Sequence, residues 1–330
     1  MFERITIIGD GAMGSVCGML LCAKGLHVTL WGYDVDQLAE MALTRQNKRF
    51  LPGYPLPEAL NFEADDRLAM KHADLIVSAV PCQFMRGIWT RLKPHVPPGI
   101  PIVSTAKGIE NETLLRPTQI LADVLGEQAY GALSGPTIAD ELARGLPATA
   151  TAASRDRTLA RAIQRTFHGE QFRVYTNTDL LGVELSGAVK NVIAIAAGII
   201  DGLGFGDNAK AALLTRGLAE IRRLGRAMGA RPRTFSGLSG LGDLVTTCIS
   251  PHGRNRSFGE RIGRGMGPQQ ATEATHSIVE GVATCRAVRA LARRHEVEMP
   301  ITEAVYAVVH EHKSVADAIS QLLQRRPKAE

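Results

Sequence analysis

Residues 5–14 read ITIIGDGAMG, an apolar run followed by glycines at the spacing GxGxxG. A helical apolar stretch, Val16 to Ala23, and a second apolar run, His27–Trp31, come next. The order strand, glycine-rich turn, helix and strand is the context that supports a dinucleotide-binding fingerprint. The glycines allow the backbone to approach a pyrophosphate, which then faces the helix N-terminus. We therefore predict a Rossmann-type domain in which the loop residues bind a dinucleotide cofactor: Gly9, Gly11, Ala12, Met13 and Gly14.

The residues after the second predicted strand normally separate NAD enzymes from NADP enzymes. An acidic residue there accepts hydrogen bonds from the ribose hydroxyls, whereas an arginine holds the extra phosphate of NADP. Here the chain has Tyr33, which is neither acidic nor an arginine. Asp34 is acidic but stands one residue beyond the position at which the acidic residue is expected. These residues leave the choice between NAD and NADP open.

Strand and helix patterns keep alternating through the first half of the chain. Apolar runs typical of buried parallel strands lie at 74–80, 102–105 and 131–133. Lys107 follows one of them, and open α/β sheets bind ligands beyond the carboxyl ends of their strands. We expect Lys107 to meet an anion or a carbonyl group. The turn 134–141 offers either backbone donors to a ligand or only a helix start.

The pattern changes near Asn177, after a last strand-like run at 172–175. Helical stretches take over from Asp179 onward, which predicts a dinucleotide-binding domain at 1–177 and a helical domain at 178–330. Residues 184–220 form the backbone of that second domain, with a break at 206–208 that can cap a second helix beginning near Ala209.

Lys190 stands near the start of an otherwise small and apolar helical stretch that ends at Ile200. A lysine in such surroundings either extends its ammonium group to the surface or needs polar partners inside the protein. The apolar run is too short to span a bilayer, so we expect no membrane insertion.

Two later loops carry further candidates. Asp243 ends a glycine-rich loop and either caps the following helix or takes part in chemistry. Arg254 and Asn255 lie in a short basic loop, which is either a solvated surface or a phosphate-binding site, because arginine binds phosphate oxygens bidentately.

The composition is that of an ordinary globular protein of 330 residues, with 45% hydrophobic and 22% charged residues. Aromatic residues make up only 5%, and the net charge of +5 comes without a basic block, so we expect no nucleic-acid partner. The five cysteines are scattered and no Cys/His spacing suits a metal, which indicates a reduced cytoplasmic protein without a metal site. We see no signal or lipidation motif.

Taken in order, these motifs resemble bacterial NAD(P)-dependent glycerol-3-phosphate dehydrogenase over nearly the whole chain. The most specific match is residues 184–220, ELSGAVKNVIAIAAGIIDGLGFGDNAKAALLTRGLAE. The supporting matches are GDGAMG at 9–14, TAKGIE at 105–110, SGPTIA at 134–139, GLGDLVTTC at 240–248 and GRNRSFG at 253–259.

The resemblance implies reversible reduction of dihydroxyacetone phosphate to sn-glycerol 3-phosphate for phospholipid synthesis. Lys190 would be the general acid and base, assisted by Asp243 and Lys107. The implied substrate contacts are Lys107, Gly135, Thr137, Lys190, Asn191, Asp243, Arg254 and Asn255. The further implied cofactor contacts are Tyr33, Lys107, Ala139, Arg254, Ile278 and Glu280.

Three positions depart from the family pattern. Thr137 replaces a serine, Gly253 replaces a serine beside the arginine, and Tyr33 stands where arginine or histidine is usual. The resemblance slightly favours NADPH, and Tyr33 works against a strict preference. The later helices, from Glu280 onward, pack a core and leave a homodimer face possible.

Two other readings compete. A related ketopantoate or β-hydroxyacid reductase would share the two-domain plan but would bind a carboxylate. A nicotinamide-sensing module without turnover would keep the GxGxxG loop yet could lose Lys190, Asp243 or Arg254, and all three are present.

Overall fold

The computed structural model describes residues 2–275 and 278–326. The chain forms two compact units, one of residues 1–107 and 115–184, the other of residues 108–114 and 185–330. The last change of unit falls after Glu184, inside the long helix α8 (Leu180–Gly202). The domain boundary at residue 177 stays a prediction.

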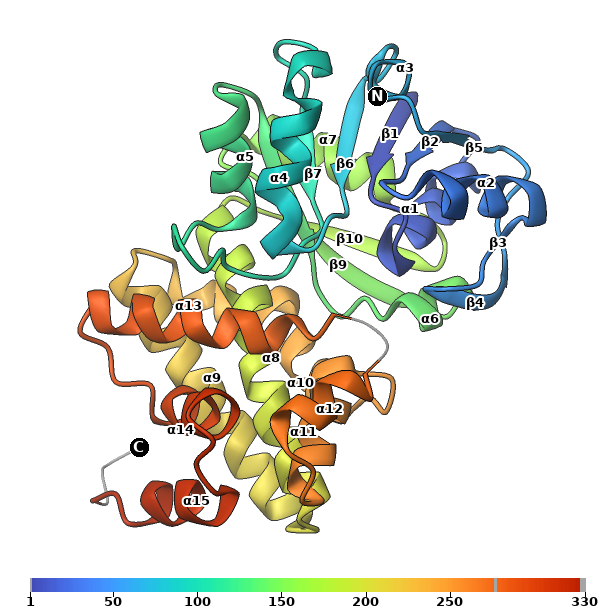
Figure 1. The fold of residues 1–330 in the computed structure, drawn as a ribbon. Coiled ribbons are helices and arrows are strands. Elements are labelled where there is room, and N and C mark those ends of the chain that lie inside the picture. The colour runs from blue at the N-terminus through green and yellow to red at the C-terminus, as the bar shows by residue number, and fades with distance from the viewer. Residues whose placement is uncertain (1, 276–277, 327–330) are drawn as a thin grey trace. The chain divides into compact units, whose positions relative to one another are not determined.

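The first unit is built on an eight-stranded sheet with the order β10-β9-β8-β7-β6-β1-β2-β5 (Figure 1). Neighbouring strands are parallel except β8 and β9, which are antiparallel. The strands are β1 (Arg4–Ile8), β2 (His27–Trp31), β5 (Leu60–Glu63), β6 (Leu75–Ser78), β7 (Ile102–Ser104), β8 (Tyr130–Ser134), β9 (Ala148–Ala153) and β10 (Phe172–Asn177). A separate antiparallel pair consists of β3 (Gln46–Asn47) and β4 (Leu51–Pro55). The predicted Rossmann-type α/β domain is confirmed.

Helices cover both faces of the sheet, and each face has its own apolar core. One core takes in α1 (Ala12–Cys22), α2 (Val35–Thr44), α6 (Ala139–Ala143) and α7 (Arg157–Phe167). The other takes in α3 (Asp66–Met70), α4 (Cys82–Leu92) and α5 (Pro117–Leu125), the last two lying side by side in Figure 1. Parallel strands buried on both faces read as continuous apolar runs, which is why β1 and β6 are visible in the sequence.

Two strands of the large sheet were missed from the sequence. β9 has the sequence ATATAA, and its small side chains give no strand signal. β5 is only four residues long and lies at the edge of the sheet.

The second unit is helical, and no strand follows β10 in the described part of the chain. Its helices after α8 are α9 (Gly206–Ala227), α10 (Asp243–Ile249), α11 (Arg254–Gly263), α12 (Pro268–Glu273), α13 (Glu280–Arg294), α14 (Pro300–His310) and α15 (Val315–Leu323). Short turns of helix lie at Pro232–Ser236 and Leu238–Gly242. The second helix, predicted to begin near Ala209, begins three residues earlier: α9 starts at Gly206, because the positive φ of Gly204 has already reversed the chain.

Helix α8 is the core helix of this unit, and its apolar residues from Val192 to Ile195 are fully buried. Its 23 residues, with an 18-residue stretch of mean hydropathy 1.6, make it long and apolar enough to cross a membrane, so the length argument from the sequence is wrong. The 18-residue stretch that meets this test is 94% buried inside the protein. Its apolar character is therefore explained by packing within the protein.

Two buried glutamates at the ends of the 184–220 stretch hold the starts of other helices. In the first unit, Glu184 accepts hydrogen bonds from the backbone N–H and the hydroxyl of Thr118, both at 2.8 Å, and pairs with Arg116. These contacts fix the first turn of α5.

In the second unit, Glu220 accepts hydrogen bonds from the backbone N–H groups of Ile301 at 2.6 Å and Thr302 at 3.3 Å, in the first turn of α14. Burial raises the pKa of Glu220 to about 7, because water no longer stabilises the carboxylate.

Candidate active site

The glycine-rich loop has the geometry that a dinucleotide needs. A side chain at Gly14 would lie 1.8 Å from the carbonyl oxygen of Gly9, so the helix packs directly on the turn. Gly9 itself has a φ of 113°, which glycine adopts without strain. In contrast, nothing lies within 4 Å of a Cβ built on Gly11, and no side chain caps the N-terminus of α1 there. The open space and the uncapped N–H groups suit a pyrophosphate.

The end of β2 leaves the cofactor choice open in the structure too. Tyr33 is 66% exposed, and the guanidinium of Arg91 lies 5.5 Å from the centre of its ring. Asp34 caps α2 by accepting a hydrogen bond from the backbone N–H of Gln37 at 3.1 Å, and Arg49 lies 3.6 Å away. The carboxylate of Asp34 is thus engaged by the protein itself.

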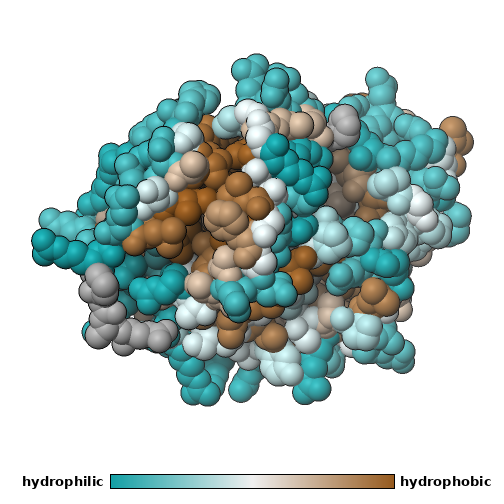
Figure 2. Space-filling view, turned by 90° about the horizontal axis from the view of Figure 1, so that it is seen from below, coloured by the Kyte–Doolittle hydropathy of each residue, from teal (hydrophilic) through white to brown (hydrophobic). Residues whose placement is uncertain are grey.

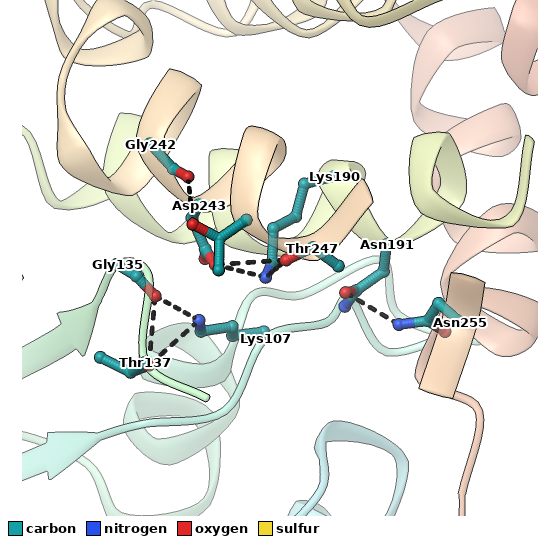
Figure 3. Close-up of polar contacts among 10 residues, drawn as sticks. Lys107, Gly135, Thr137, Lys190, Asn191, Gly242, Asp243, Thr247 and Asn255 are labelled. Atoms are coloured by element: carbon teal, nitrogen blue, oxygen red, sulfur yellow. Dashed lines mark hydrogen bonds and ion pairs between the residues drawn. The ribbon is translucent and has the colours of Figure 1, made fainter. Parts of the chain in front are cut away.

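Three predicted site residues of the first unit lie together at the carboxyl end of the sheet (Figure 3). The ammonium of Lys107 donates to the carbonyl oxygen of Gly135 at 2.8 Å and lies 3.5 Å from the hydroxyl of Thr137. That hydroxyl also donates to the carbonyl of Gly135, at 3.1 Å. Gly135 has a φ of 149°, and a side chain there would come within 3.0 Å of the backbone of β9. The sharp turn therefore brings the hydroxyl of Thr137 back to Lys107. Ala139 follows as the first residue of α6.

In the second unit, Lys190 and Asp243 form a buried ion pair with 2.5 Å between Nζ and Oδ1. Only 5% of Lys190 and 2% of Asp243 is exposed. Lys190 therefore does not extend to the surface. Asp243 is the first residue of α10 rather than its cap, which is Gly242, so its carboxylate is directed to the lysine (Figure 3).

Thr247 completes this group, and the sequence analysis missed it. Lys190 donates a hydrogen bond to the hydroxyl of Thr247, which also lies 3.4 Å from Oδ1 of Asp243. Asp243 and Thr247 are four residues apart on α10 and so lie on one face of the helix. That spacing was the signal that could have found it.

Asn191 and Asn255 are brought together beside Lys190 (Figure 3). The amide nitrogen of Asn255 donates to the side-chain oxygen of Asn191 at 3.0 Å. Its own oxygen accepts from the backbone N–H of Gly281 at 2.9 Å, next to Glu280 at the start of α13. Asn255 thus joins α8, α11 and α13, and the direct substrate contacts of both asparagines stay predictions.

Arg254 is the first residue of α11 and its side chain is exposed. In the described part of the chain it has no ion pair, so its guanidinium is available to an anion. Gly253 precedes it as an N-cap without a side chain, and a Cβ there would lie 3.0 Å from the carbonyl oxygen of Thr247. A serine at 253 would need the backbone to shift slightly.

The predicted late cofactor contacts are less defined. Ile278 is 43% exposed, and Glu280 is the first residue of α13. Among residues 2–275 and 278–326, no three His, Cys, Asp or Glu side chains cluster as a metal site. The roles of all these residues in binding and catalysis stay predictions.

Comparisons with known proteins identify the family. Residues 4–160 match the family described as NAD-dependent glycerol-3-phosphate dehydrogenase N-terminus, and residues 179–320 match the C-terminus of the same family. A glycerol-3-phosphate dehydrogenase [NAD(P)+] of Geobacter sulfurreducens is 48% identical over 100% of this chain and 99% of its own length. One from Streptomyces coelicolor is 46% identical over 99% of this chain and 98% of its own.

Solved structures agree with the sequence comparisons. The crystal structure of glycerol-3-phosphate dehydrogenase from Coxiella burnetii superimposes with a TM-score of 0.94 at 39% identity, covering 98% of this chain and 99% of that one. A ketopantoate reductase from Ralstonia eutropha shares the fold, with a TM-score of 0.62 at 15% identity, covering 96% of this chain and 100% of that one. The likeness to the reductase extends to the fold alone. The resemblance drawn from the motifs is confirmed, and the chain belongs to the NAD-dependent glycerol-3-phosphate dehydrogenase family.

Proposed function

We propose that this protein catalyses the reversible, NAD(P)H-dependent reduction of dihydroxyacetone phosphate to sn-glycerol 3-phosphate. The observation that carries the proposal is the buried Lys190 ammonium on α8, held by Asp243 and Thr247 of α10. Reduction of a ketone creates an alkoxide, and a water-poor site strengthens the attraction between that oxygen and a fixed ammonium group.

Lys190 acts as general acid in this proposal. The bound nicotinamide supplies the hydride to carbon two of the substrate. The proton passes from Nζ of Lys190 to the former carbonyl oxygen, which balances the addition of hydrogen across the C=O bond. Asp243 and Thr247 keep Nζ in place and protonated before the step. In the oxidation direction the lysine takes the proton back.

The phosphate is bound by Arg254, since its exposed guanidinium lies at the N-terminus of α11, where backbone N–H groups also favour an anion. Lys107 provides a second cation to the substrate, positioned by the carbonyl of Gly135 and close to Thr137. The turn around Gly11, where no atom lies within 4 Å of an added Cβ, would hold the pyrophosphate of the cofactor.

A spectrophotometric assay tests the proposal. Purified protein is mixed with dihydroxyacetone phosphate and either NADH or NADPH, and the nicotinamide absorbance is followed. Oxidation with either cofactor supports the reaction, and the ratio of the two rates measures the preference that Tyr33 leaves open. Ketopantoate and a β-ketoacid serve as comparison substrates. Turnover of ketopantoate but not of the phosphate would favour the reductase alternative, and cofactor binding without any turnover would favour the sensing module.

Phospholipid synthesis, as the use of the product, and a cytoplasmic location are part of this proposal. Self-association into a homodimer also stays a prediction. Figure 2 shows a face on which apolar residues gather inside a hydrophilic rim, an arrangement common at protein–protein contacts. Sedimentation velocity of the purified protein at several concentrations will measure the oligomeric state.

A further inference from the structure

Two cationic side chains, from α9 and α11, pair with one carboxylate on α8 in the second unit. Asp201, in the last turn of α8, receives a hydrogen bond at 2.6 Å from Nε of Arg256, in the first turn of α11. Its other carboxylate oxygen pairs with the ammonium of Lys210 in α9. All three side chains are mostly buried, between 15% and 18% exposed. None of them takes part in the proposed chemistry, although Asp201 and Lys210 lie in the 184–220 stretch and Arg256 in GRNRSFG.

The backbones of α8 and α11 touch directly beside this cluster. A Cβ on Gly198 would lie 1.9 Å from the carbonyl oxygen of Arg256, and one on Gly259 would lie 2.0 Å from that of Ile195. One turn further along, the same close approach recurs at Gly202 and Gly263, where a Cβ would lie 2.4 Å from a backbone oxygen of the facing helix. With no side chain between the two backbones, the axis of α11 is set by α8.

The glycine contacts fix the distance between the two helices. Side-chain contacts must fix how far α11 is shifted along α8 and how it is rotated about its own axis. Asn255 reaches Asn191 on α8, whereas its neighbour Arg256 reaches Asp201. These two points on α8 are ten residues apart, or roughly 15 Å along a helix. Two adjacent residues are therefore held in opposite directions along α8. The remaining residue of the Arg254-Asn255-Arg256 run, Arg254, stays exposed.

We propose that Asp201 and Arg256 are positioning residues of the phosphate subsite, which hold the first turn of α11 so that Arg254 presents its guanidinium to the substrate phosphate. The inference rests on the proposed role of Arg254. Loss of the Asp201–Arg256 pair frees the first turn to rotate or fray, and small misplacements of a binding group are costly. Lys190, Asp243 and Thr247 lie on α8 and α10 and keep their contacts, so the chemical step is retained.

The test compares Asp201→Asn with Arg254→Ala. For each variant kcat and KM are measured with dihydroxyacetone phosphate and with dihydroxyacetone, which lacks the phosphate, and the inhibition constant of inorganic phosphate is determined. Asp201→Asn should raise KM for the phosphorylated substrate roughly ten- to a hundredfold. It should weaken phosphate inhibition in parallel and leave kcat/KM for dihydroxyacetone unchanged. A general loss of structure would lower both activities together.

Arg261→Ala is the matched control, because Arg261 lies in the last turn of the same helix and donates a hydrogen bond to the hydroxyl of Thr275 at 2.8 Å, outside the Asp201–Arg256 pair. It should leave both substrates unaffected. Arg256→Lys keeps the positive charge opposite Asp201 and should restore part of the phosphate selectivity that Arg256→Ala loses, so the test does not depend on one variant folding.

The outcomes separate the two proposals. If Arg254→Ala loses phosphate selectivity while folded Asp201→Asn and Arg256→Ala keep it, the positioning role of Asp201 and Arg256 is overturned. The proposed binding of the phosphate by Arg254 is then retained. If Arg254→Ala itself keeps full selectivity, the proposed phosphate site is wrong, and the inference falls with it.

Discussion

The ammonium of Lys190 lies 2.5 Å from the carboxylate of Asp243, although 53 residues separate them in the chain. Both side chains are almost fully buried, and α10 adds the hydroxyl of Thr247 to the same ammonium. A buried charge is stable only when it is paired, and here each of the two side chains supplies the partner of the other.

Replacing Lys190 by methionine should lower kcat by roughly two to four orders of magnitude, because the general acid is removed while the apolar stem is kept. Cofactor binding should change little, since the GxGxxG loop is untouched. Single-turnover kinetics and NADPH fluorescence titration measure the two quantities. Turnover close to that of the wild-type protein would show that Lys190 is not the general acid.

Thr247→Val should reduce kcat by about tenfold, because one hydrogen bond to the ammonium of Lys190 is lost while the shape is kept. The matched control is Thr246→Val, since the hydroxyl of Thr246 donates to the carbonyl of Gly242, the N-cap of the same helix, at 3.0 Å. Equal effects of the two substitutions on steady-state kcat would show that Thr247 matters only for packing.

Arg254→Ala should raise KM for dihydroxyacetone phosphate by about a hundredfold and should affect KM for the cofactor much less, because a charge-assisted contact to phosphate is lost. Initial-rate measurements over both substrate concentrations give the two constants. If both KM values stay unchanged, Arg254 does not bind the substrate phosphate.

Gly198→Ala should destabilise the protein by about 3 kcal/mol or more, because the new methyl group would meet a backbone oxygen of α11 that cannot rotate away. The control is Gly87→Ala in α4, where nothing lies within 4 Å of the added carbon. That change should be neutral or stabilise by about 0.5–1 kcal/mol through helix propensity. Urea unfolding of both variants decides; similar midpoints would contradict the tight contact.

The stability of the protein should fall as the pH rises from about 5 to 8, in part through Glu220. Its pKa is raised from 4.5 to about 7 in the folded state, so between these values the folded protein holds a proton that the unfolded chain has lost. The contribution is complete below pH 4.5 and disappears as the pH passes 7.

Glu220→Gln should flatten this pH dependence, because the amide does not titrate. Thermal unfolding of the wild-type protein and of Glu220→Gln at a series of pH values measures how the stability of each depends on pH. Parallel curves for the two proteins would mean that Glu220 is not the group responsible.

The sequence predicted the parts of the fold that depend on local pattern. β1, α1 and β2 follow from apolar runs around glycines, and the helical second half follows from 3.6-residue spacing. β9 escaped because alanine and threonine alternate there without large apolar residues, so its strand state depends on pairing with β8 and β10.

The sequence predicted the ionisable residues of the candidate site. It did not predict the contacts that hold those residues in place. Lys190 and Asp243 are conspicuous as charges next to apolar or glycine-rich segments. The four-residue spacing from Asp243 places Thr247 on the same face of α10, but its contact with Lys190 depends on how α8 and α10 pack. The pairing of Asn191 with Asn255 depends on the packing of α8 and α11, which no local pattern in the sequence encodes. Family resemblance supplied the roles, and the structure supplied the partners.

The burial of α8 by the helices around it also determines which fragments of the chain can remain in solution. Any fragment that contains this helix but ends before α11 would leave one side of it without a cover, and its apolar surface would be exposed to solvent. Chains shortened at the C-terminal side, by proteolysis or by premature termination, should therefore aggregate or be degraded rather than persist as partly active enzyme.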